Sequence, residues 1–336
     1  MTVVGPFGLS VRDQALEADV QAGLTAVEEG LLEATKSEVP FITEAAQHLV
    51  RAGGKRFRPL LVMLAAQFGD PYAPGVVPSA VVVELTHLAT LYHDDVMDEA
   101  AVRRGVPSAN TRWGNSVAVL TGDFLFARAS HILADLGPEA VRVQAEAFER
   151  LVTGQILETA GPQDGRDPVE HYLDVLSGKT GSLVAVSCRF GAMMSGADET
   201  VVDVLTQYGE RLGVAFQLAD DVLDIASDSH ESGKTPGTDL REGIPTLPVL
   251  RLRERAARLG LAEDIALCEL LDSDMSDDAR HAEALAALRV HPALEQARRD
   301  TVRYAEDARA ALAPLPDLDA KAALMELCDA VVHRAG

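Results

Sequence analysis

Apolar residues return every three or four positions along most of this 336-residue chain. The pattern is clear in residues 141–160 and 201–226, and it is typical of amphipathic helices. Alternating runs of β-branched residues, which would predict strands, are almost absent; residues 75–88 come nearest, and they continue into a helical pattern. Since an average helix has about 11–12 residues, we expect an all-α protein with roughly ten or more helices.

Breaks in this periodicity fall where glycine, proline and aspartate cluster, at residues 68–78, 161–168, 227–248 and 313–319. No low-complexity linker divides the chain, so we expect one domain over residues 1–336, with residues 1–20 loosely ordered. Residues 227–248 form a long loop for a compact domain, which indicates an active-site lid.

The chain is strongly acidic, with 52 Asp and Glu against 30 Lys and Arg and a formal net charge of -22. A hydrophobic content of 47% is enough for a substantial core. Binding of nucleic acid needs a basic face, and the overall charge argues against one. Any anionic ligand must therefore be captured locally.

Targeting signals are not evident. The N-terminus lacks a basic segment followed by an apolar one, and no stretch approaches 18 uncharged apolar residues, so we expect no signal peptide and no membrane span. Peripheral contact with a membrane is compatible with this sequence. Three widely separated cysteines favour a reducing, cytoplasmic location: Cys188, Cys268 and Cys328.

Two acidic boxes share the pattern DDxxD: "DDVMD" at 94–98 and "DDVLD" at 220–224. Residues four apart share one face of a helix, so the outer aspartates of each box point the same way, and like charges there destabilise the helix by a few tenths of a kcal/mol. Oxygen ligands of this kind suit Mg²⁺, which bridges a few carboxylates to substrate phosphates. A single box could be a solvated helix face, but the repetition within apolar sequence favours a metal site.

Basic residues accompany the boxes. Lys55, Arg56 and Arg58 follow a glycine pair, an arrangement that brings backbone and cations close to a phosphate. Further cationic or polar positions lie in "RRG", "SGKTG" and "SGKTPG": Arg103, Arg104, Lys179, Thr180 and Lys234. Each alone could be a surface residue; together with two acidic boxes they indicate a site for more than one diphosphate.

His87 and Gln217 share the register of the boxes. His87 lies two helical turns before Asp94, and Gln217 lies about one turn before Asp220. Glu84 and His87 also spell ExxH, which raises a di-iron helical bundle as an alternative. That site needs a second ExxH and further inward glutamates, and the sequence has no second copy.

Five motifs in order resemble the trans-type isoprenyl diphosphate synthases, the polyprenyl synthetase family: "GGKRFRP", "HDDVMDEAAVRRG", "GKTG", "FQLADDVLDI" and "GKTPGTDLREGIPTLP". The resemblance covers nearly the whole chain. It implies an isoprenoid synthase fold with a deep central cavity, a homodimer, and three Mg²⁺ ions when substrate is bound. It also implies elongation of an allylic diphosphate with isopentenyl diphosphate.

The resemblance assigns roles by position. The metal ligands would be Asp94, Asp98, Asp220 and Asp224, with Asp95 and Asp221 as supports, and Lys179 is grouped with the aspartates as catalytic. Isopentenyl diphosphate would meet Lys55, Arg58, His87 and Arg104. The allylic diphosphate would meet Arg103, Lys179, Thr180, Gln217 and Lys234. One departure is Ile244, where family members often carry lysine.

Product length depends on the helix before the first box, where Ala89 and Thr90 are small and short-chain members often carry aromatic residues. The sequence therefore resembles medium- and long-chain enzymes, and we expect a product longer than farnesyl, a quinone side-chain precursor. The deeper floor would involve Phe124, Phe126 or Phe148. A short-chain farnesyl or geranylgeranyl synthase is the alternative.

Two other functions fit less well. A terpene cyclase shares the first box, but its second metal motif usually mixes Asn, Ser and Glu, whereas this chain keeps an intact second box. A non-catalytic subunit of a heteromeric synthase would tend to lose the boxes. Both boxes are present here, which favours a catalytic chain.

Overall fold

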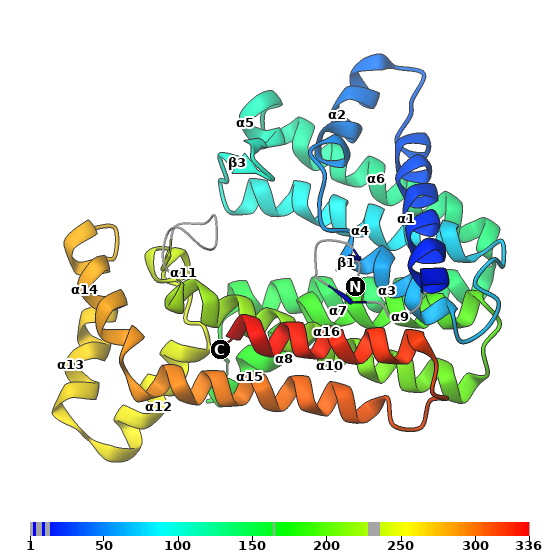
Figure 1. Ribbon diagram of the computed structural model, residues 1–336. Coiled ribbons are helices and arrows are strands. Elements are labelled where there is room, and N and C mark those ends of the chain that lie inside the picture. Colours follow the sequence, from blue (N-terminus) through cyan, green and yellow to red (C-terminus); the bar gives the residue numbers. More distant parts are fainter. Residues whose placement is uncertain (1–2, 5–8, 11–13, 164, 228–235, 336) are drawn as a thin grey trace. The chain divides into compact units, whose positions relative to one another are not determined.

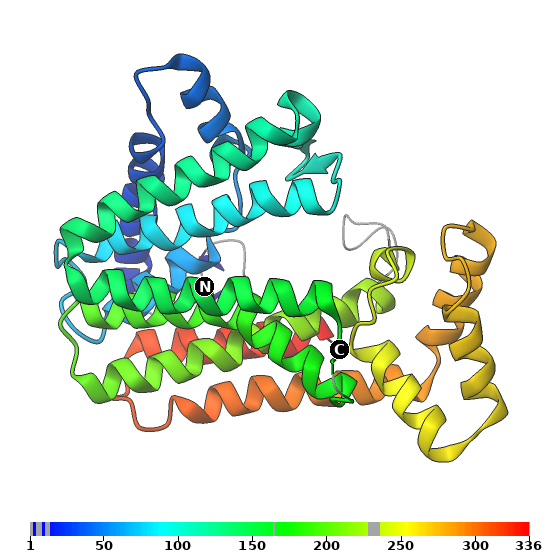
Figure 2. The same ribbon diagram turned by 180° about the vertical axis from the view of Figure 1, so that it is seen from behind.

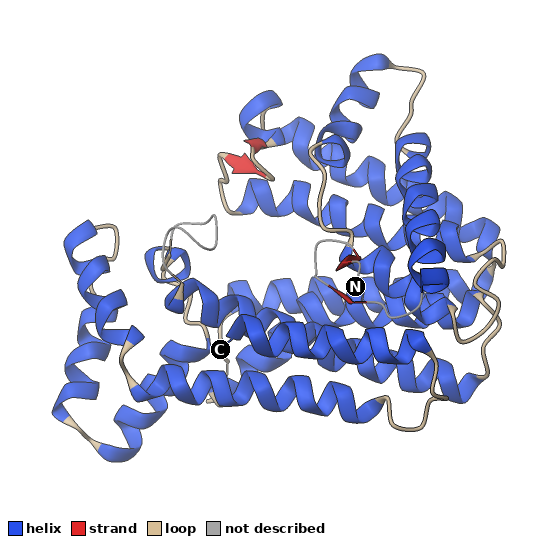
Figure 3. Cartoon of the chain, viewed as in Figure 1, coloured by secondary structure: helices blue, strands red, loops and turns tan. Residues whose placement is uncertain are grey.

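The computed structural model describes residues 3–4, 9–10, 14–163, 165–227 and 236–335. Most of these residues lie in helices, and the described strands form two short antiparallel pairs, as Figure 3 shows. The prediction of an all-α protein is confirmed.

The chain forms two compact units, each assembled from three stretches. Unit 1 comprises Met1–Glu149, Leu183–Gly209 and Ala311–Glu326; unit 2 comprises Arg150–Ser182, Glu210–Ala310 and Leu327–Gly336. Because neither unit is continuous in sequence, no linker divides them. The single domain expected from the sequence stays a prediction, and each unit is described by itself.

Unit 1 contains six complete helices: α1 (Gln14–Ala34), α2 (Pro40–Arg51), α3 (Phe57–Ala66), α4 (Val76–Met97), α5 (Ala109–Trp113) and α6 (Asn115–Leu136). Its strand pairs are β1 (Val3–Val4) with β2 (Leu9–Ser10), and β3 (Val102–Arg103) with β4 (Val106–Pro107). Five helices have residues in both units: α7 (Pro138–Ala160), α9 (Ser182–Met194), α10 (Glu199–Ala226), α15 (Pro292–Ala311) and α16 (Asp319–Ala335). Figure 1 labels these elements.

Unit 2 adds α8 (Pro168–Leu176), the π-helix η2 (Ser177–Gly181), α11 (Thr238–Arg241), α12 (Leu247–Leu259), α13 (Ala262–Leu271) and α14 (Asp278–Arg289). Side chains of Asp167 and Asp277 accept hydrogen bonds from the first backbone N–H groups of α8 and α14, which explains where these helices begin. Helices α12, α13 and α14 lie next to one another in both views (Figure 1, Figure 2).

The core of unit 1 is built on α3 and α4. Every residue of α3 is buried except Arg58. The β-branched run Val81–Val83 in α4 is also buried, and α4 packs against both α3 and α6. This packing explains why residues that favour strands form a helix here, since burial of apolar side chains outweighs a small difference in propensity.

Part of the expected N-terminal segment belongs to a helix. Helix α1 begins at Gln14 and so includes residues 14–20, while the loose order that we expected for residues 1–20 stays a prediction. Leu16 and Val20 are buried, and the free energy gained by burying them holds the first turns of the helix. The expectation for the preceding residues lies largely outside the described part of the chain.

Among the described helices, α6 alone is long and apolar enough to cross a membrane, by length and composition only. One such helix is weak evidence, because a core helix of a soluble protein passes the same test. It also carries Asp123 and Arg128. The absence of a membrane span therefore stays a prediction.

Candidate active site

The loop between α2 and α3 carries the first group of predicted basic residues. Gly53 and Gly54 have φ values of 83° and 151°, which favour glycine, and Arg56 is left-handed with φ 48°. A Cβ atom on Gly54 would lie 2.9 Å from Cζ of Arg104. Glycine is therefore required where the loop and this arginine approach each other.

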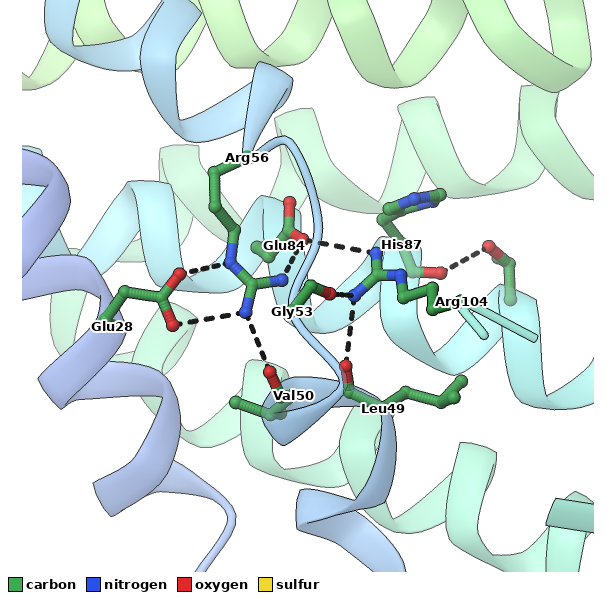
Figure 4. A network of polar contacts seen from close by, with 9 residues as sticks. Glu28, Leu49, Val50, Gly53, Arg56, Glu84, His87 and Arg104 are labelled. Atoms are coloured by element: carbon green, nitrogen blue, oxygen red, sulfur yellow. Dashed lines mark hydrogen bonds and ion pairs between the residues drawn. The ribbon is translucent and has the colours of Figure 1, made fainter. Parts of the chain in front are cut away.

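Arg56 is buried and belongs to an internal ion-pair network (Figure 4). Its guanidinium pairs with the carboxylates of Glu28 and Glu84, at 2.9 Å to Glu84, and donates to the Val50 carbonyl at 3.0 Å. Desolvation lowers the pKa of this arginine, but the two carboxylates outweigh that effect and raise it. Arg56 therefore anchors the loop, and the resemblance assigned it no ligand.

Arg104 lies on the other side of Glu84, with His87 beside it, as Figure 4 shows. It pairs with Glu84 at 3.7 Å and donates to the carbonyls of Leu49, at 3.1 Å, and Gly53. Burial lowers the pKa of Arg104 despite these partners. The structure thus brings Arg104, a predicted ligand of isopentenyl diphosphate, to the loop that carries Lys55, just before Arg58 in the first turn of α3.

Arg58 is positively charged, and His87 lies near Arg58 and Arg104. The negative charge of Glu84 compensates these arginines only in part. The buried Nε of Arg58 has no hydrogen-bond partner in the described structure. Burial, reinforced by the charge of Arg104 and opposed by Glu84, lowers the pKa of Arg58 to about 10. The pKa of His87 lies well below its usual value because of burial and the neighbouring Arg58 and Arg104. Such a cluster favours an anionic ligand.

The first acidic box ends α4. Asp94 is half-buried, while Asp98 is exposed and forms the C-cap of the helix. Two carboxylates at the negative end of a helix dipole are unfavourable without a cation. Asp95 is buried; it accepts a hydrogen bond from Nε of Arg103 at 2.6 Å, and Asn110 Nδ2 donates to its backbone carbonyl at 3.0 Å. Burial raises the pKa of Asp95, although Arg103 opposes this.

Lys55 is exposed on its loop, and Arg103 is occupied by Asp95. The expected contact of Arg103 with the allylic diphosphate stays a prediction. The ExxH alternative fails at Glu84, because this carboxylate is engaged by Arg56 and Arg104. Among the described residues, no three or more His, Cys, Asp or Glu side chains are placed to form a metal site by themselves, so an ion at either box would need further ligands such as water and substrate phosphates.

The second box lies in the last turns of α10, and Asp221 is buried there. It accepts hydrogen bonds from the Tyr172 hydroxyl of α8 and from Gln217 Nε2, the latter at 3.0 Å. Burial raises the pKa of Asp221 to about 6, although both donors oppose it. Sequence reasoning missed Tyr172, because nothing in the spacing links α8 to the box.

The outer aspartates of this box are partly exposed and make other contacts. Asp220 pairs with Arg334 of α16 at 2.9 Å, and this guanidinium lies 4.7 Å above the ring of Phe216. The carboxylate of Asp224 accepts the backbone N–H groups of Thr238, at 3.2 Å, and Asp239, at 3.1 Å. Asp224 therefore fixes the start of α11. Arg334 was also missed, since it stands far along the chain.

The predicted lid over 227–248 contains α11 in its described part. His281 Nε2 lies 2.7 Å from the Gly237 carbonyl, and Arg241 pairs with Asp278 at 2.9 Å. Both contacts join the part of the segment around α11 to α14. Lys234 lies outside the described residues. Ile244 is 40% exposed, so an uncharged side chain lies at the surface at the position where family members often carry lysine.

The "SGKTG" motif forms the π-helix η2, a rare geometry that occurs often at functional sites. Lys179 pairs with Glu158 at 2.6 Å, and the Thr180 hydroxyl donates to Gln217 Oε1 at 3.4 Å. A Cβ atom on Gly154 would lie 2.6 Å from the Lys179 nitrogen, so α7 holds the motif at close range. Thr180 and Gln217 thereby connect to Asp221.

Both boxes suit a hard cation. Their donors are carboxylate oxygens, which Mg²⁺ prefers, and Mg²⁺ completes its octahedral shell with water and substrate phosphates. Each buried middle aspartate is held by hydrogen bonds, while the outer aspartates are at least partly exposed. The roles of all these residues stay predictions.

Ala89, whose small side chain we expect to leave room for a long product, is fully buried in α4. Thr90 is half-buried, and its hydroxyl donates to the His87 carbonyl at 2.8 Å. The neighbouring helix α6 approaches closely there: a Cβ atom on Gly122 would lie 3.1 Å from the Ala89 carbonyl. Phe126 stacks with Phe148 at 4.5 Å. Both rings lie in unit 1, and their expected part in the floor of the product tunnel stays a prediction.

Glu84→Gln should destabilise the protein by about 3–5 kcal/mol, because it removes a buried negative charge shared by Arg56 and Arg104. Urea unfolding measures this change. The matched control is Glu139→Gln, whose pair with Arg142 is exposed and which should leave the free energy of unfolding nearly unchanged. Equal effects of the two substitutions would show that the buried network does not hold the loop.

Comparison with known proteins supplies the family. Residues 39–288 match the polyprenyl synthetase family. The nonaprenyl diphosphate synthase of Mycobacterium tuberculosis is 47% identical over 331 residues, which cover 98% of this chain and 97% of that protein.

Two solved structures are similar in fold. The geranylgeranyl pyrophosphate synthase of Corynebacterium glutamicum, complexed with calcium and isoprenyl diphosphate, gives a TM-score of 0.87 at 44% identity and covers 98% of this chain and 100% of that one. A decaprenyl diphosphate synthase of Rhodobacter capsulatus gives a TM-score of 0.86 at 36% identity. The match covers 96% of this chain and 99% of that one. This chain therefore belongs to the polyprenyl synthetase family, as a trans-prenyl diphosphate synthase of the medium- and long-chain type.

Proposed function

We propose that this prenyltransferase condenses isopentenyl diphosphate head-to-tail with an allylic diphosphate, giving a trans-polyprenyl diphosphate longer than farnesyl. The observation that carries the proposal is the half-buried cluster of Arg58, His87 and Arg104: the Nε of Arg58 has no hydrogen-bond partner in the described structure, and Arg104 shares the carboxylate of Glu84 with Arg56. A diphosphate is an anion of suitable charge. The identity to the nonaprenyl diphosphate synthase supports the long product.

In this mechanism, Lys55, Arg58, His87 and Arg104 bind the diphosphate of isopentenyl diphosphate and orient its double bond. Lys179, Thr180, Gln217 and Lys234 bind the allylic diphosphate, together with Arg103 if ligand draws it from Asp95. The carbon–oxygen bond of the allylic diphosphate breaks, the double bond attacks the resulting cation, and a proton leaves to the pyrophosphate. No side chain acts as a nucleophile.

Asp94, Asp98, Asp220 and Asp224 would hold the Mg²⁺ ions, three of them with substrate bound. When bound, Mg²⁺ stabilises the negative charge that develops on the leaving diphosphate. Arg103 and Tyr172 hold Asp95 and Asp221, which would support the helix ends that carry the outer aspartates. Residues 227–248 would close over the substrates and exclude water, which would otherwise quench the cation.

Two further features belong to the proposal. The product would serve as a quinone side-chain precursor. The three cysteines are free, which supports work in the reducing cytoplasm.

Incubation with isopentenyl diphosphate, farnesyl diphosphate and Mg²⁺, followed by chromatography of dephosphorylated products, tests this function. We expect products longer than farnesyl and no turnover in EDTA. Asp94→Asn and Asp220→Asn should each lower the rate by about 10²-fold or more. Asp203→Asn, an exposed change on the same helix as the second box, should retain full activity. Undiminished turnover in the two box variants would contradict the metal assignment.

Replacement of Ala89 by phenylalanine should shorten the products, because a ring at this buried position narrows the space along α4. Thr90→Phe gives a second test at a half-buried position, where the added volume strains the core less. Product sizing, with thermal unfolding to check that each variant folds, makes the comparison. Products of unchanged length in both folded variants would remove α4 as the wall.

We propose a homodimer through α6, because Leu120 of this helix is 65% exposed and Val119 beside it is also exposed in the single chain. Sedimentation should give twice the 35.8 kDa mass. Leu120→Glu should yield single chains, whereas the control Val290→Glu, at another exposed apolar residue, should not. A purified chain of single mass that is active only with a different subunit would favour a heteromeric enzyme instead.

A further inference from the structure

Unit 1 contains a cavity of about 580 Å³ that is separate from the basic cluster described above. Helix α2, strand β4 and helix α5 supply most of its wall. The lining residues are Pro40, Thr43, Glu44, Gln47, His48, Arg51, Ala52, Val106, Pro107 and Arg112. None of them has a role in the proposed reaction.

The charge of this cavity is positive on balance. Two guanidinium groups, of Arg51 and Arg112, line it together with one carboxylate, of Glu44. Glu44 pairs with Arg112. For Arg51, the described residues provide no carboxylate within ion-pair distance; its Nε and Nη2 atoms donate instead to the neutral Gln47 Oε1, at 3.1 and 2.7 Å. Arg51 is thus held in place without being neutralised.

Gln47 gives this arginine a firm support. Its side chain is only 4% exposed, and its Nε2 donates to the Leu32 carbonyl at 2.8 Å. This second contact fixes the amide so that its oxygen faces Arg51. An arginine oriented in advance loses less conformational entropy when it binds an anion.

His48 orients the second arginine. Its Nε2 lies 2.7 Å from the Pro107 carbonyl and must donate to it, because a carbonyl only accepts. In the neutral ring Nδ1 then accepts, and Arg112 Nη1 lies 3.5 Å from it. The guanidinium of Arg112 also lies 4.4 Å above the ring of Trp113. Arg112 is therefore directed by contacts on several sides.

We propose that this cavity binds a small oxyanion of the phosphate class, with Arg51 as the principal ligand and Arg112 as the second. The fork of an arginine matches the oxygens of a phosphate group. Apolar atoms of Pro40, Val106 and Pro107 line the same cavity, which is open to solvent. This site does not depend on the proposed reaction.

Trp113 provides a local signal for the test. It is the chain's single tryptophan, and its ring lies 5.1 Å from that of His48 as well as beneath Arg112. Because Arg112 lines the cavity, an ion bound there changes the surroundings of the indole. Tryptophan fluorescence therefore reports on this cavity.

The full chain is titrated with sodium phosphate at constant ionic strength, with chloride as the balancing anion. We expect a saturable change in tryptophan fluorescence, and Arg51→Gln should raise the dissociation constant about tenfold. The control is Arg142→Gln, an exposed arginine that pairs with Glu139 on α7, which should leave the constant unchanged. No saturable change in the wild type, or the same constant in Arg51→Gln, overturns the site.

A competition experiment with isopentenyl diphosphate distinguishes binding in this cavity from binding at the Arg58 cluster. Phosphate should still bind with the same signal when isopentenyl diphosphate is saturating; its displacement would mean that the signal arises at the diphosphate site, and the proposal would fail. Arg51→Lys is used if Arg51→Gln does not fold, and it should weaken phosphate binding less than tenfold but measurably. An unchanged constant in that variant also overturns the assignment.

Discussion

The buried carboxylate of Glu84 is the interaction on which the loop between α2 and α3 depends. It lies between Arg56, at 2.9 Å, and Arg104, at 3.7 Å, two residues that come from distant parts of the chain. Both arginines have left-handed backbones, with φ values of 48° and 54°. Such conformations cost about 1–3 kcal/mol each and persist only where the surroundings impose them. Here the side-chain contacts impose them, and they thereby set the positions of Lys55 and Arg58.

A common arrangement underlies the two aspartate boxes. In each box the middle aspartate is buried and receives side-chain hydrogen bonds, Asp95 from Arg103 and Asp221 from Tyr172 and Gln217. The outer aspartates stay at least partly exposed. Each box therefore has two adjacent aspartates in different surroundings. The buried one is held by hydrogen bonds at the helix end, and the exposed ones are accessible to the ligands that we propose for them.

The helices and the clustering of Arg58, His87 and Arg104 could be predicted from the sequence, because periodicity and motif spacing act within a few turns or within a shared family pattern. The contacts of Tyr172 and Arg334 could not, since they join segments separated by many residues and leave no mark in local spacing. Glu84 was misleading in isolation: its spacing to His87 suggests a metal ligand, and only the tertiary structure gives it two arginine partners. The helical structure of residues 14–20 likewise depends on tertiary burial of Leu16 and Val20.

The acidity of the whole chain does not prevent it from binding anions. At physiological ionic strength, exposed charges are screened beyond about 8 Å, so a net charge of -22 acts weakly on a buried group. What matters locally is that Arg58 is desolvated beside Arg104 and shares only Glu84 with its neighbours, which lowers its pKa to about 10. In the function that we propose, a diphosphate would supply the negative charge that Glu84 does not fully provide for Arg58 and Arg104. A second carboxylate at this point would then stabilise the fold while weakening the proposed site.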